Sequence, residues 1–268
     1  MEYNFWTEKS IEFATQRNYL DELFKVYPIS PNLRREVPKD KEDLIKRAFN
    51  SQNNKELLKE LLNWELFPLK DSYIPFLRRD KSAIDRNPNT VNRIAGNLYN
   101  LGYEEMFEKM TEPKETNRQI GPMFKNWVDK GTIGMKVVKN EETFIRGNEP
   151  MIYNVSDEEM KRFANSNLGY NREKGLDFIA KINNKYVLAE AKFLTDFGGH
   201  QNAQFQDAID TLHTKLENPR VKEEIIQIII ADGVLFLKGD NKFNKYLRNN
   251  KNEVIISSLL LREYLYQL

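Results

Sequence analysis

The sequence predicts an α/β (α+β) protein in which a mixed β-sheet is flanked by helices and preceded by a helical N-terminal region. Helical periodicity dominates from the N-terminus to about Pro113. Two stretches with the pattern of strands, 175–193 and 224–237, follow it, and amphipathic helical segments surround them. We therefore expect a helical region over residues 1–112 and a sheet-containing core over residues 113–268.

The N-terminal region contains several candidate helices. Thr7 is a suitable cap for a helix that runs to Tyr27, where Pro28 marks the end. Thr90 caps another candidate, which stops at Gly102. The other helices expected in this region span residues 41–49, 55–64, 73–79 and 103–110.

Two features of this region suggest contact with DNA. Residues 82–102 weakly match a helix-turn-helix whose second helix would carry Asn92 and Arg93. A group of basic residues precedes that helix, namely Arg78, Arg79, Lys81 and Arg86. We favour the simpler explanation that these charges form a solvated rim around a packed helix, because charged runs usually mark exposed faces.

The segment that joins the two regions is rich in hydrogen-bond donors. Pro122 suits the first turn of a helix. The exposed polar residues expected ahead of it are Thr116, Asn117, Arg118 and Gln119. Donors in this position favour phosphate binding, and a capped connecting loop explains them equally well.

A central hairpin is predicted between Gly175 and Phe193, because Asn183-Asn184 separates two runs rich in aromatic and branched residues. A two-residue turn there pairs Ile182 with Lys185 and, counting outward, sets Asp177 against Glu190. Strand alternation then divides the hairpin into two faces. One face carries Asp177, Ile179, Leu188, Glu190 and Lys192, and the other is apolar and carries Phe178, Ala180, Ile182, Val187, Ala189, Ala191 and Phe193.

The expected pairing brings two carboxylates into one small space. Directly opposed residues have Cβ atoms roughly 4.5 to 5.5 Å apart, and two like charges at about 5 Å cost roughly 3 kcal/mol at an effective dielectric constant of about 20. A divalent cation between Asp177 and Glu190 removes this cost. Carboxylate oxygens suit Mg²⁺, which also takes phosphate oxygens from a substrate, and Lys192 would point to the same place.

The order of an Asp followed by Glu190-Ala191-Lys192 on the next strand resembles the PD-(D/E)XK nuclease superfamily. Leu176 stands where the motif has proline. The resemblance implies that Asp177, Glu190 and the Ala191 carbonyl hold Mg²⁺ and that Lys192 orients the attacking water and stabilises the charge that develops on the phosphate. It also implies an extra acid on a preceding helix, for which Glu158 and Glu159 are candidates. A structural ion pair is the alternative role for Lys192.

The segment after the hairpin predicts a helix from about Gln201 to Leu216, which Pro219 ends. Its exposed start is expected to include Gly199, His200, Gln201, Asn202, Gln204 and Gln206. Side-chain amides can bind adenine in the major groove, and a helix N-terminus attracts phosphate, so we expect this cluster to contact DNA. Taken one at a time, these residues are explained as a cap and a turn, and His200 as a loop or DNA-contacting residue rather than a base.

Other elements complete the expected core. Residues 132–145 predict a hairpin around Lys139-Asn140, and Ser156 with Glu159 forms a capping box that starts a helix and by itself explains Glu159. The remaining expectations are strands at 224–230, 234–237 and 253–256 and helices at 242–249 and 257–267.

Composition excludes several classes of site. The chain has no cysteine and only two histidines, which excludes disulfides, thiolate sites and most multi-histidine metal sites. Its 41 basic and 40 acidic residues balance, so net charge does not indicate a partner. No apolar stretch is long enough to span a membrane and the start is too polar for a signal peptide, so we expect no membrane association and a cytoplasmic protein.

Over roughly Gly175 to Phe243, the chain also resembles orthodox type II restriction endonucleases, particularly the branch that cuts GAATTC. The resemblance implies a homodimer that binds a short palindrome in double-stranded DNA and cuts both strands with Mg²⁺, leaving 5′-phosphates. Two alternatives remain open. A repair or recombination nuclease would share the site, and a non-catalytic helix-turn-helix regulator would need no metal.

Overall fold

The computed structural model describes residues 2–28, 34–113 and 119–268, which form two compact units. We call them the sheet unit, built from the described parts of 1–29 and 115–268, and the helical unit, built from the described part of 30–114. The helical unit is thus an insertion, because the chain enters it from the sheet unit and returns to the sheet unit afterwards. The predicted fold class, a mixed sheet flanked by helices, is confirmed.

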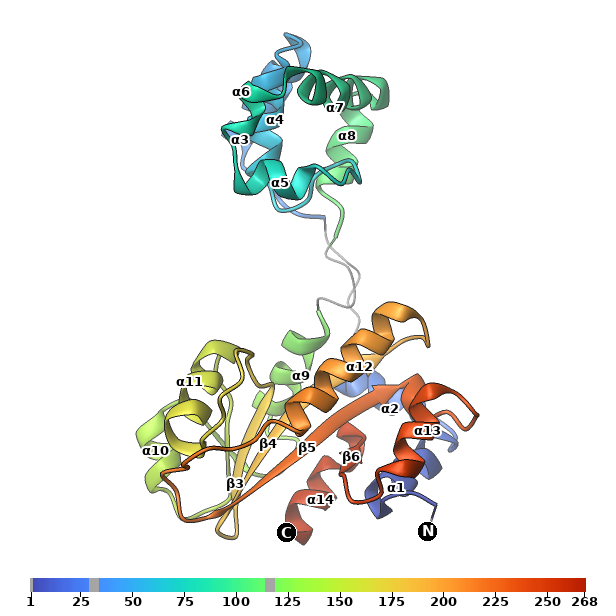
Figure 1. Ribbon diagram of the computed structural model, residues 1–268, viewed down its shortest axis with the longest axis vertical. Helices are drawn as coiled ribbons and strands as arrows, with labels where there is room; N and C mark the ends of the chain where they lie inside the picture. The colour runs from blue at the N-terminus through green and yellow to red at the C-terminus, as the bar shows by residue number, and fades with distance from the viewer. Residues whose placement is uncertain (1, 29–33, 114–118) are drawn as a thin grey trace. The chain divides into compact units, whose positions relative to one another are not determined.

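The sheet unit contains six strands in a single sheet (Figure 1). The strands are β1 (Lys136–Val138), β2 (Met151–Tyr153), β3 (Phe178–Ile182), β4 (Lys185–Leu194), β5 (Glu224–Gly233) and β6 (Ile255–Ile256). Their order in space is their order in the chain. β2, β3 and β4 are antiparallel neighbours, whereas the β1–β2, β4–β5 and β5–β6 pairs are parallel.

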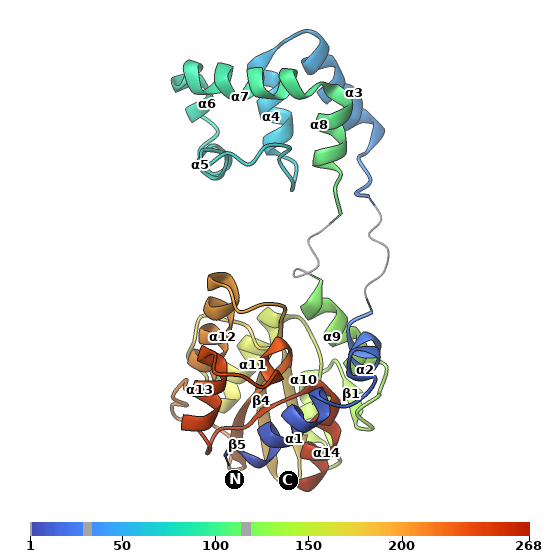
Figure 2. The same ribbon diagram turned by 90° about the vertical axis from the view of Figure 1, so that its right-hand side faces the viewer.

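Helices cover both faces of this sheet. They are α1 (Phe5–Ala14), α2 (Tyr19–Val26), α9 (Ile120–Asp129), α10 (Glu141–Arg146), α11 (Asp157–Leu168), α12 (Gly199–Leu212), α13 (Lys242–Asn249) and α14 (Leu261–Gln267), with short 3₁₀ turns η2 (Val234–Phe236) and η3 (Ser258–Leu260). Figure 2 shows α2 and α9 on one side of the sheet and α11, α12 and α13 on the other.

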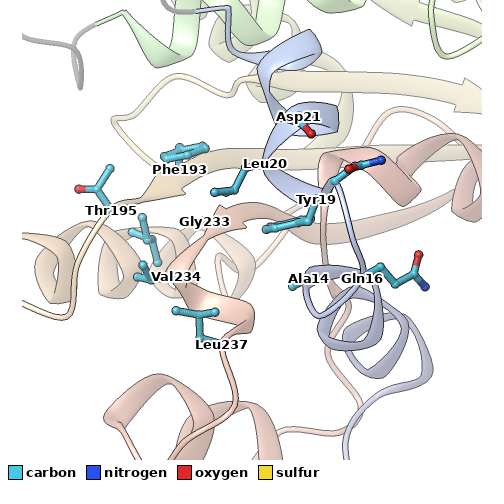
Figure 3. A pocket seen from close by; sticks show the side chains of 12 residues that line it. Ala14, Gln16, Tyr19, Leu20, Asp21, Phe193, Thr195, Gly233, Val234 and Leu237 are labelled. Atoms are coloured by element: carbon cyan, nitrogen blue, oxygen red, sulfur yellow. The ribbon is translucent and has the colours of Figure 1, made fainter.

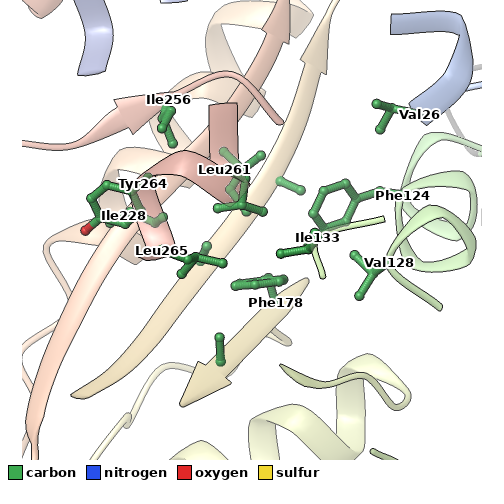
Figure 4. Packing of buried hydrophobic residues seen from close by; sticks show 14 of the residues in the cluster. Val26, Phe124, Val128, Ile133, Phe178, Ile228, Ile256, Leu261, Tyr264 and Leu265 are labelled. Carbon is green, nitrogen blue, oxygen red and sulfur yellow. The ribbon is translucent and has the colours of Figure 1, made fainter. Parts of the chain in front are cut away.

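The apolar face of the β3–β4 hairpin packs in one hydrophobic core. Phe178 is buried there against Phe124 of α9 and residues of α14, as Figure 4 shows. The opposite face of the sheet carries two smaller clusters. One lies under α10 and α11 and includes Leu188, and the other lies under α12 and α13 and includes Leu194. The alternation predicted from the sequence therefore separates two packed layers.

The first 28 residues pack with the sheet unit, whereas the sequence grouped them with the helical region 1–112. Ile11 is buried beside the strands of the sheet, and Tyr27 lies in the main core. The Thr7 hydroxyl donates to the Ile255 carbonyl oxygen at 2.9 Å, and the Ser257 N–H donates to the Ser10 hydroxyl at 2.9 Å. Helical periodicity shows that an apolar stripe exists but not which partner covers it, so α1 and α2 could not be assigned from pattern alone.

The helical unit has a core of its own. Its helices are α3 (Lys39–Asn50), α4 (Asn54–Leu62), α5 (Ile74–Arg79), α6 (Ala83–Arg86), α7 (Pro88–Leu101) and α8 (Tyr103–Met110). The predicted helix 103–110 is confirmed, as is the stop at Gly102, where φ is 81°. The suggested helix-turn-helix is not present, because α6 has only four residues and Asn87 alone joins it to α7.

Several predicted elements of the sheet unit differ from the structure. The helix expected at 7–27 is two helices, because Asn18 adopts a left-handed conformation with φ of 69°. The hairpin expected at 132–145 is wrong. Asn140 caps α10 by accepting a hydrogen bond from the Thr143 N–H at 2.9 Å, and β1 instead pairs in parallel with β2, a strand that the sequence did not reveal.

Two further differences lie after the hairpin. The strand expected at 234–237 is the 3₁₀ turn η2, since Gly233 at φ of 85° redirects the chain. α12 ends at Leu212, and Leu216 forms an isolated bridge with Tyr170 instead of continuing the helix. By contrast, the helix predicted at 242–249 and both hydrogen bonds of the Ser156–Glu159 capping box are confirmed.

Candidate active site

The turn of the β3–β4 hairpin sets the site. Asn183 and Asn184 have φ of 48° and 60°, as the predicted two-residue turn requires. The strands pair in the predicted register, Ile182 with Lys185 and onward. Asp177 directly precedes β3, and its carboxylate accepts a hydrogen bond from the Ala191 N–H at 2.9 Å. The turn thereby places Asp177 beside the strand that carries Glu190.

Glu190 is the most buried charged group of the site, with only 2% of its surface exposed. Its Oε1 atom contacts the ammonium groups of Lys192 and of Lys174, the latter at 2.5 Å. Its Oε2 atom is buried and has no hydrogen-bond partner within the described residues. A buried carboxylate oxygen normally has a donor or a cation beside it, so Oε2 is an open ligand position.

The electrostatics of the site follow from this crowding. Burial, reinforced by the charge of Glu190, raises the pKa of Asp177 above its ordinary value. Burial opposes the charged form of Lys192, but Glu190 and Asp177 outweigh it, so the pKa of Lys192 is raised. The site therefore stabilises a cation on Lys192 and favours added positive charge near Asp177.

Lys174 and Asp207 belong to the same cluster and were missed by sequence reasoning. Lys174 bridges Glu190 to Asp207 of α12, and Arg172 fixes Asp207 by an ion pair of 2.6 Å and a hydrogen bond to the Asp207 carbonyl oxygen. The pKa of Asp207 is lowered because Lys174 and Arg172 outweigh its burial. The only sequence signal was a pair of basic residues just before Gly175, too common a pattern to single out.

The cluster occupies a polar gap in an otherwise apolar sheet face. Glu190 and Lys192 lie on β4 between Leu188, which belongs to the α11 cluster, and Leu194, which belongs to the α12 cluster. Apolar packing on both sides buries the Glu190 carboxylate without covering Lys192, whose side chain is 19% exposed. Such a setting strengthens electrostatic interactions with a bound phosphate.

The residues present fit a divalent cation bound by few protein ligands. No group of three or more His, Cys, Asp or Glu residues within the described ranges could hold a metal. Mg²⁺ does not need one, since it commonly binds one or two carboxylates and completes its shell with water and phosphate. Asp177, Glu190 and the Ala191 carbonyl oxygen are the candidate donors, and the partnerless Glu190 Oε2 supports this fit.

The acids at the start of α11 have separate partners. Glu159 completes the capping box with Ser156, whose hydrogen bonds lower the pKa of Glu159, and Glu158 pairs with Lys161 at 3.0 Å. Asp157, which the sequence did not single out, is the α11 acid that contributes to the raised pKa of Asp177. The backbone at Asp157 also comes close to residue 175. Glycine is required there because a Cβ on residue 175 would lie 2.6 Å from the Asp157 Cβ.

The predicted DNA-contacting residues divide into three groups. Gly199 and His200 are exposed at the start of α12, and Gln204 contacts the His200 ring at 3.1 Å. Asn202 donates to the Phe197 carbonyl oxygen at 3.1 Å. The expected exposure of Gln201 is wrong, because only 5% of it is exposed and its Oε1 accepts from a loop N–H.

The third group cannot be placed. Asn117 and Arg118 lie outside the described residues. Their predicted contact with phosphate stays a prediction.

A pocket of about 690 Å³ begins one residue beyond Lys192 (Figure 3). The pocket is lined by Phe193 near the end of β4, Thr195 just after that strand, Tyr19 and Leu20 of α2, and Val234. Its walls are mainly apolar, and none of the charged groups of the site lines it. The pocket is therefore a neighbour of the polar cluster rather than the place where the acids meet.

A family model described as Tsp45I type II restriction enzyme matches residues 4–268. The chain belongs to this family. No curated protein and no solved structure gives a significant match. As a type II restriction enzyme it is a site-specific nuclease that acts on double-stranded DNA, which removes the non-catalytic regulator from the open hypotheses. Within the described part of this enzyme, no helix is long and apolar enough to cross a membrane.

Proposed function

We propose that this restriction enzyme uses Mg²⁺ to hydrolyse phosphodiester bonds and leaves 5′-phosphates. The active site would consist of Asp177, Glu190 and Lys192. The observation that carries the proposal is the buried Oε2 atom of Glu190, which has no partner in the described chain although Asp177 and two lysines surround the same carboxylate. The resemblance to PD-(D/E)XK nucleases supports the same assignment.

Asp177, Glu190 and the Ala191 carbonyl would hold the ion, which supplies positive charge to the scissile phosphate and lowers the pKa of a bound water. The Ala191 N–H fixes the orientation of the Asp177 carboxylate. Lys192, with a raised pKa, keeps its proton and would stabilise the negative charge that develops on the phosphate oxygens. Lys174 would remain paired with both Asp207 and Glu190 and would hold the Glu190 carboxylate in place.

The start of α12 would contact the DNA. Its first N–H groups are suited to phosphate, and the exposed His200 and the partly exposed Gln204, which contact each other at 3.1 Å, would meet base edges. A homodimer would present two such helices with two-fold symmetry, as a symmetric site on DNA requires.

The test uses plasmid DNA with Mg²⁺ and three proteins. Wild type is expected to produce discrete fragments with 5′-phosphates, and Lys192→Ala is expected to lose cleavage while retaining DNA binding. Lys185→Ala is the matched control. It removes a lysine from the same strand, at the end next to the hairpin turn, where the lysine side chain is 28% exposed. Wild-type cleavage rates in Lys192→Ala would refute the mechanism.

A further inference from the structure

The helical unit exposes two large aromatic side chains on one helix. α5 buries Ile74 and Leu77, while Tyr73 and Phe76 are each 60% exposed. Among residues 34–113 these are the large apolar side chains that stand out in solvent. Tyr73, Phe76 and Arg79 follow each other at intervals of three residues, so they share the outer side of α5.

Arg93 of α7 is held over this surface. Its guanidinium carbon lies 5.5 Å from the centre of the Tyr73 ring, and its Nη1 atom pairs with Asp71 Oδ2 at 2.6 Å. Asp71 is itself fixed by accepting from the Tyr73 N–H at 2.9 Å. The Asp71 side chain is only 13% exposed and that of Arg93 is 45% exposed. The ion pair therefore holds the arginine through a mostly buried carboxylate, while part of the arginine side chain remains accessible to solvent.

Arg79 adds a second cation. It is exposed and has no ion-pair or hydrogen-bond partner in the described chain. Residues 70–93 contain six basic and three acidic residues, whereas residues 104–112 contain one basic and four acidic residues. Positive charge is thus concentrated in residues 70–93, the segment that contains α5, of a nearly neutral unit.

We propose that the surface formed by Tyr73, Phe76, Arg79 and Arg93, which we call the α5 surface, binds the sugar-phosphate backbone of duplex DNA. A stacked, pre-oriented arginine suits a phosphate, because its planar fork forms two hydrogen bonds at little entropic cost. The exposed Phe76, on the helix that follows Tyr73, can pack on sugars or wedge at the groove edge. The proposal rests on the proposed function in assigning duplex DNA as the substrate, and it gives the helical unit the role of a second DNA contact.

The experiment measures binding of the full-length protein to a labelled duplex of mixed sequence over a range of salt concentrations. All proteins carry Lys192→Ala so that DNA stays intact. Arg79→Gln and Arg93→Gln are made singly and together, and Phe76→Ser tests the apolar part. The matched control is Lys46→Gln with Arg47→Gln on α3, which also removes two exposed charges and a contact between a cation and a ring.

Each single arginine variant of the α5 surface, Arg79→Gln or Arg93→Gln, is expected to lower affinity about five- to tenfold near 0.1 M salt and to reduce the slope of log affinity against log salt by about 0.9. The α3 control should keep the parent slope. Unchanged affinity and slope in a folded Arg79→Gln variant would overturn the proposal, and that variant loses no contact that the fold uses. A change in sedimentation without a change in DNA affinity would also overturn it, since the surface would then contact protein.

These outcomes separate this proposal from that of the active site. If Lys192→Ala still cuts DNA, the proposed mechanism fails, but the slopes measured without Mg²⁺ still decide whether the α5 surface contacts DNA. If Lys192→Ala is inactive and the slopes do not change, the active site stands and the α5 surface is refuted.

Discussion

Replacement of Lys174 by Met tests how the buried charge of Glu190 is balanced. The variant keeps most of the packing of the lysine stem and removes its ammonium group, which lies 2.5 Å from Glu190 Oε1. Loss of one partner of a buried ion pair costs about 3–5 kcal/mol when the other partner is left alone. Here Glu190 keeps Lys192, Asp207 keeps Arg172, and Lys174 is 26% exposed, so we expect a loss of about 1–3 kcal/mol.

The assay is thermal unfolding with and without Mg²⁺. For a domain of this size, about 1 kcal/mol corresponds to a shift of roughly 2–4 °C in Tm, so Lys174→Met should lower the Tm of the sheet unit by about 2–12 °C without metal. Mg²⁺ should recover part of the loss, because the ion would supply charge at Glu190. Lys136→Met is the control, since its ion pair with Glu149 is exposed on both sides. Equal Tm values for Lys174→Met and the control would show that the contact does not balance Glu190.

Three further predictions concern the supporting structure. Asp232 is fully buried, and burial raises its pKa from 3.8 to about 6 despite three hydrogen bonds, so its stabilising contribution is present below about pH 4 and is lost as pH rises through 6. Urea unfolding at pH 4 and 7 should therefore show a loss, larger by about 3 kcal/mol in wild type than in Asp232→Asn, and equal losses would contradict this account. Gly233→Ala should destabilise the protein by about 1–3 kcal/mol, because φ is 85° and a Cβ would clash with a strand carbonyl. Gly96→Ala, in the middle of α7 where a Cβ meets no other atom, should instead stabilise it by up to about 1 kcal/mol. Similar unfolding curves for the two variants would contradict this reasoning. Gln201→Ala should lower the unfolding free energy by about 1 kcal/mol, more than the exposed Gln206→Ala, and a loss of DNA affinity at unchanged stability would instead make Gln201 a DNA contact.

The central hairpin was predictable because its determinants are local. Asn183-Asn184 specifies the turn, the turn specifies the register, and the register brings Asp177 to Glu190. The alternation of side chains then fixed which face is apolar. Local rules were sufficient because β3 and β4 are adjacent in the chain.

Other parts of the site depended on contacts between distant segments. Lys174 meets Asp207 across 33 residues, and Asp157 reaches Asp177 because α11 packs beside the chain at Gly175. Gln201 was expected in solvent, but a loop folds back on it and uses its side chain. Asn140 illustrates a different ambiguity, since the same residue type suits a hairpin turn and a helix cap, and tertiary pairing of β1 with β2 decided between them.

The position of α1 has a consequence for the order in which the protein folds during synthesis. All the core contacts of the helical unit lie within residues 34–113, so this unit can fold as soon as it leaves the ribosome. The sheet unit cannot be completed then, because Thr7 and Ser10 bind residues 255 and 257, which lie 248 and 247 residues further along the chain. A cell that makes this nuclease therefore completes the sheet unit only after residue 257 has been added, and translation products truncated before that residue would lack it.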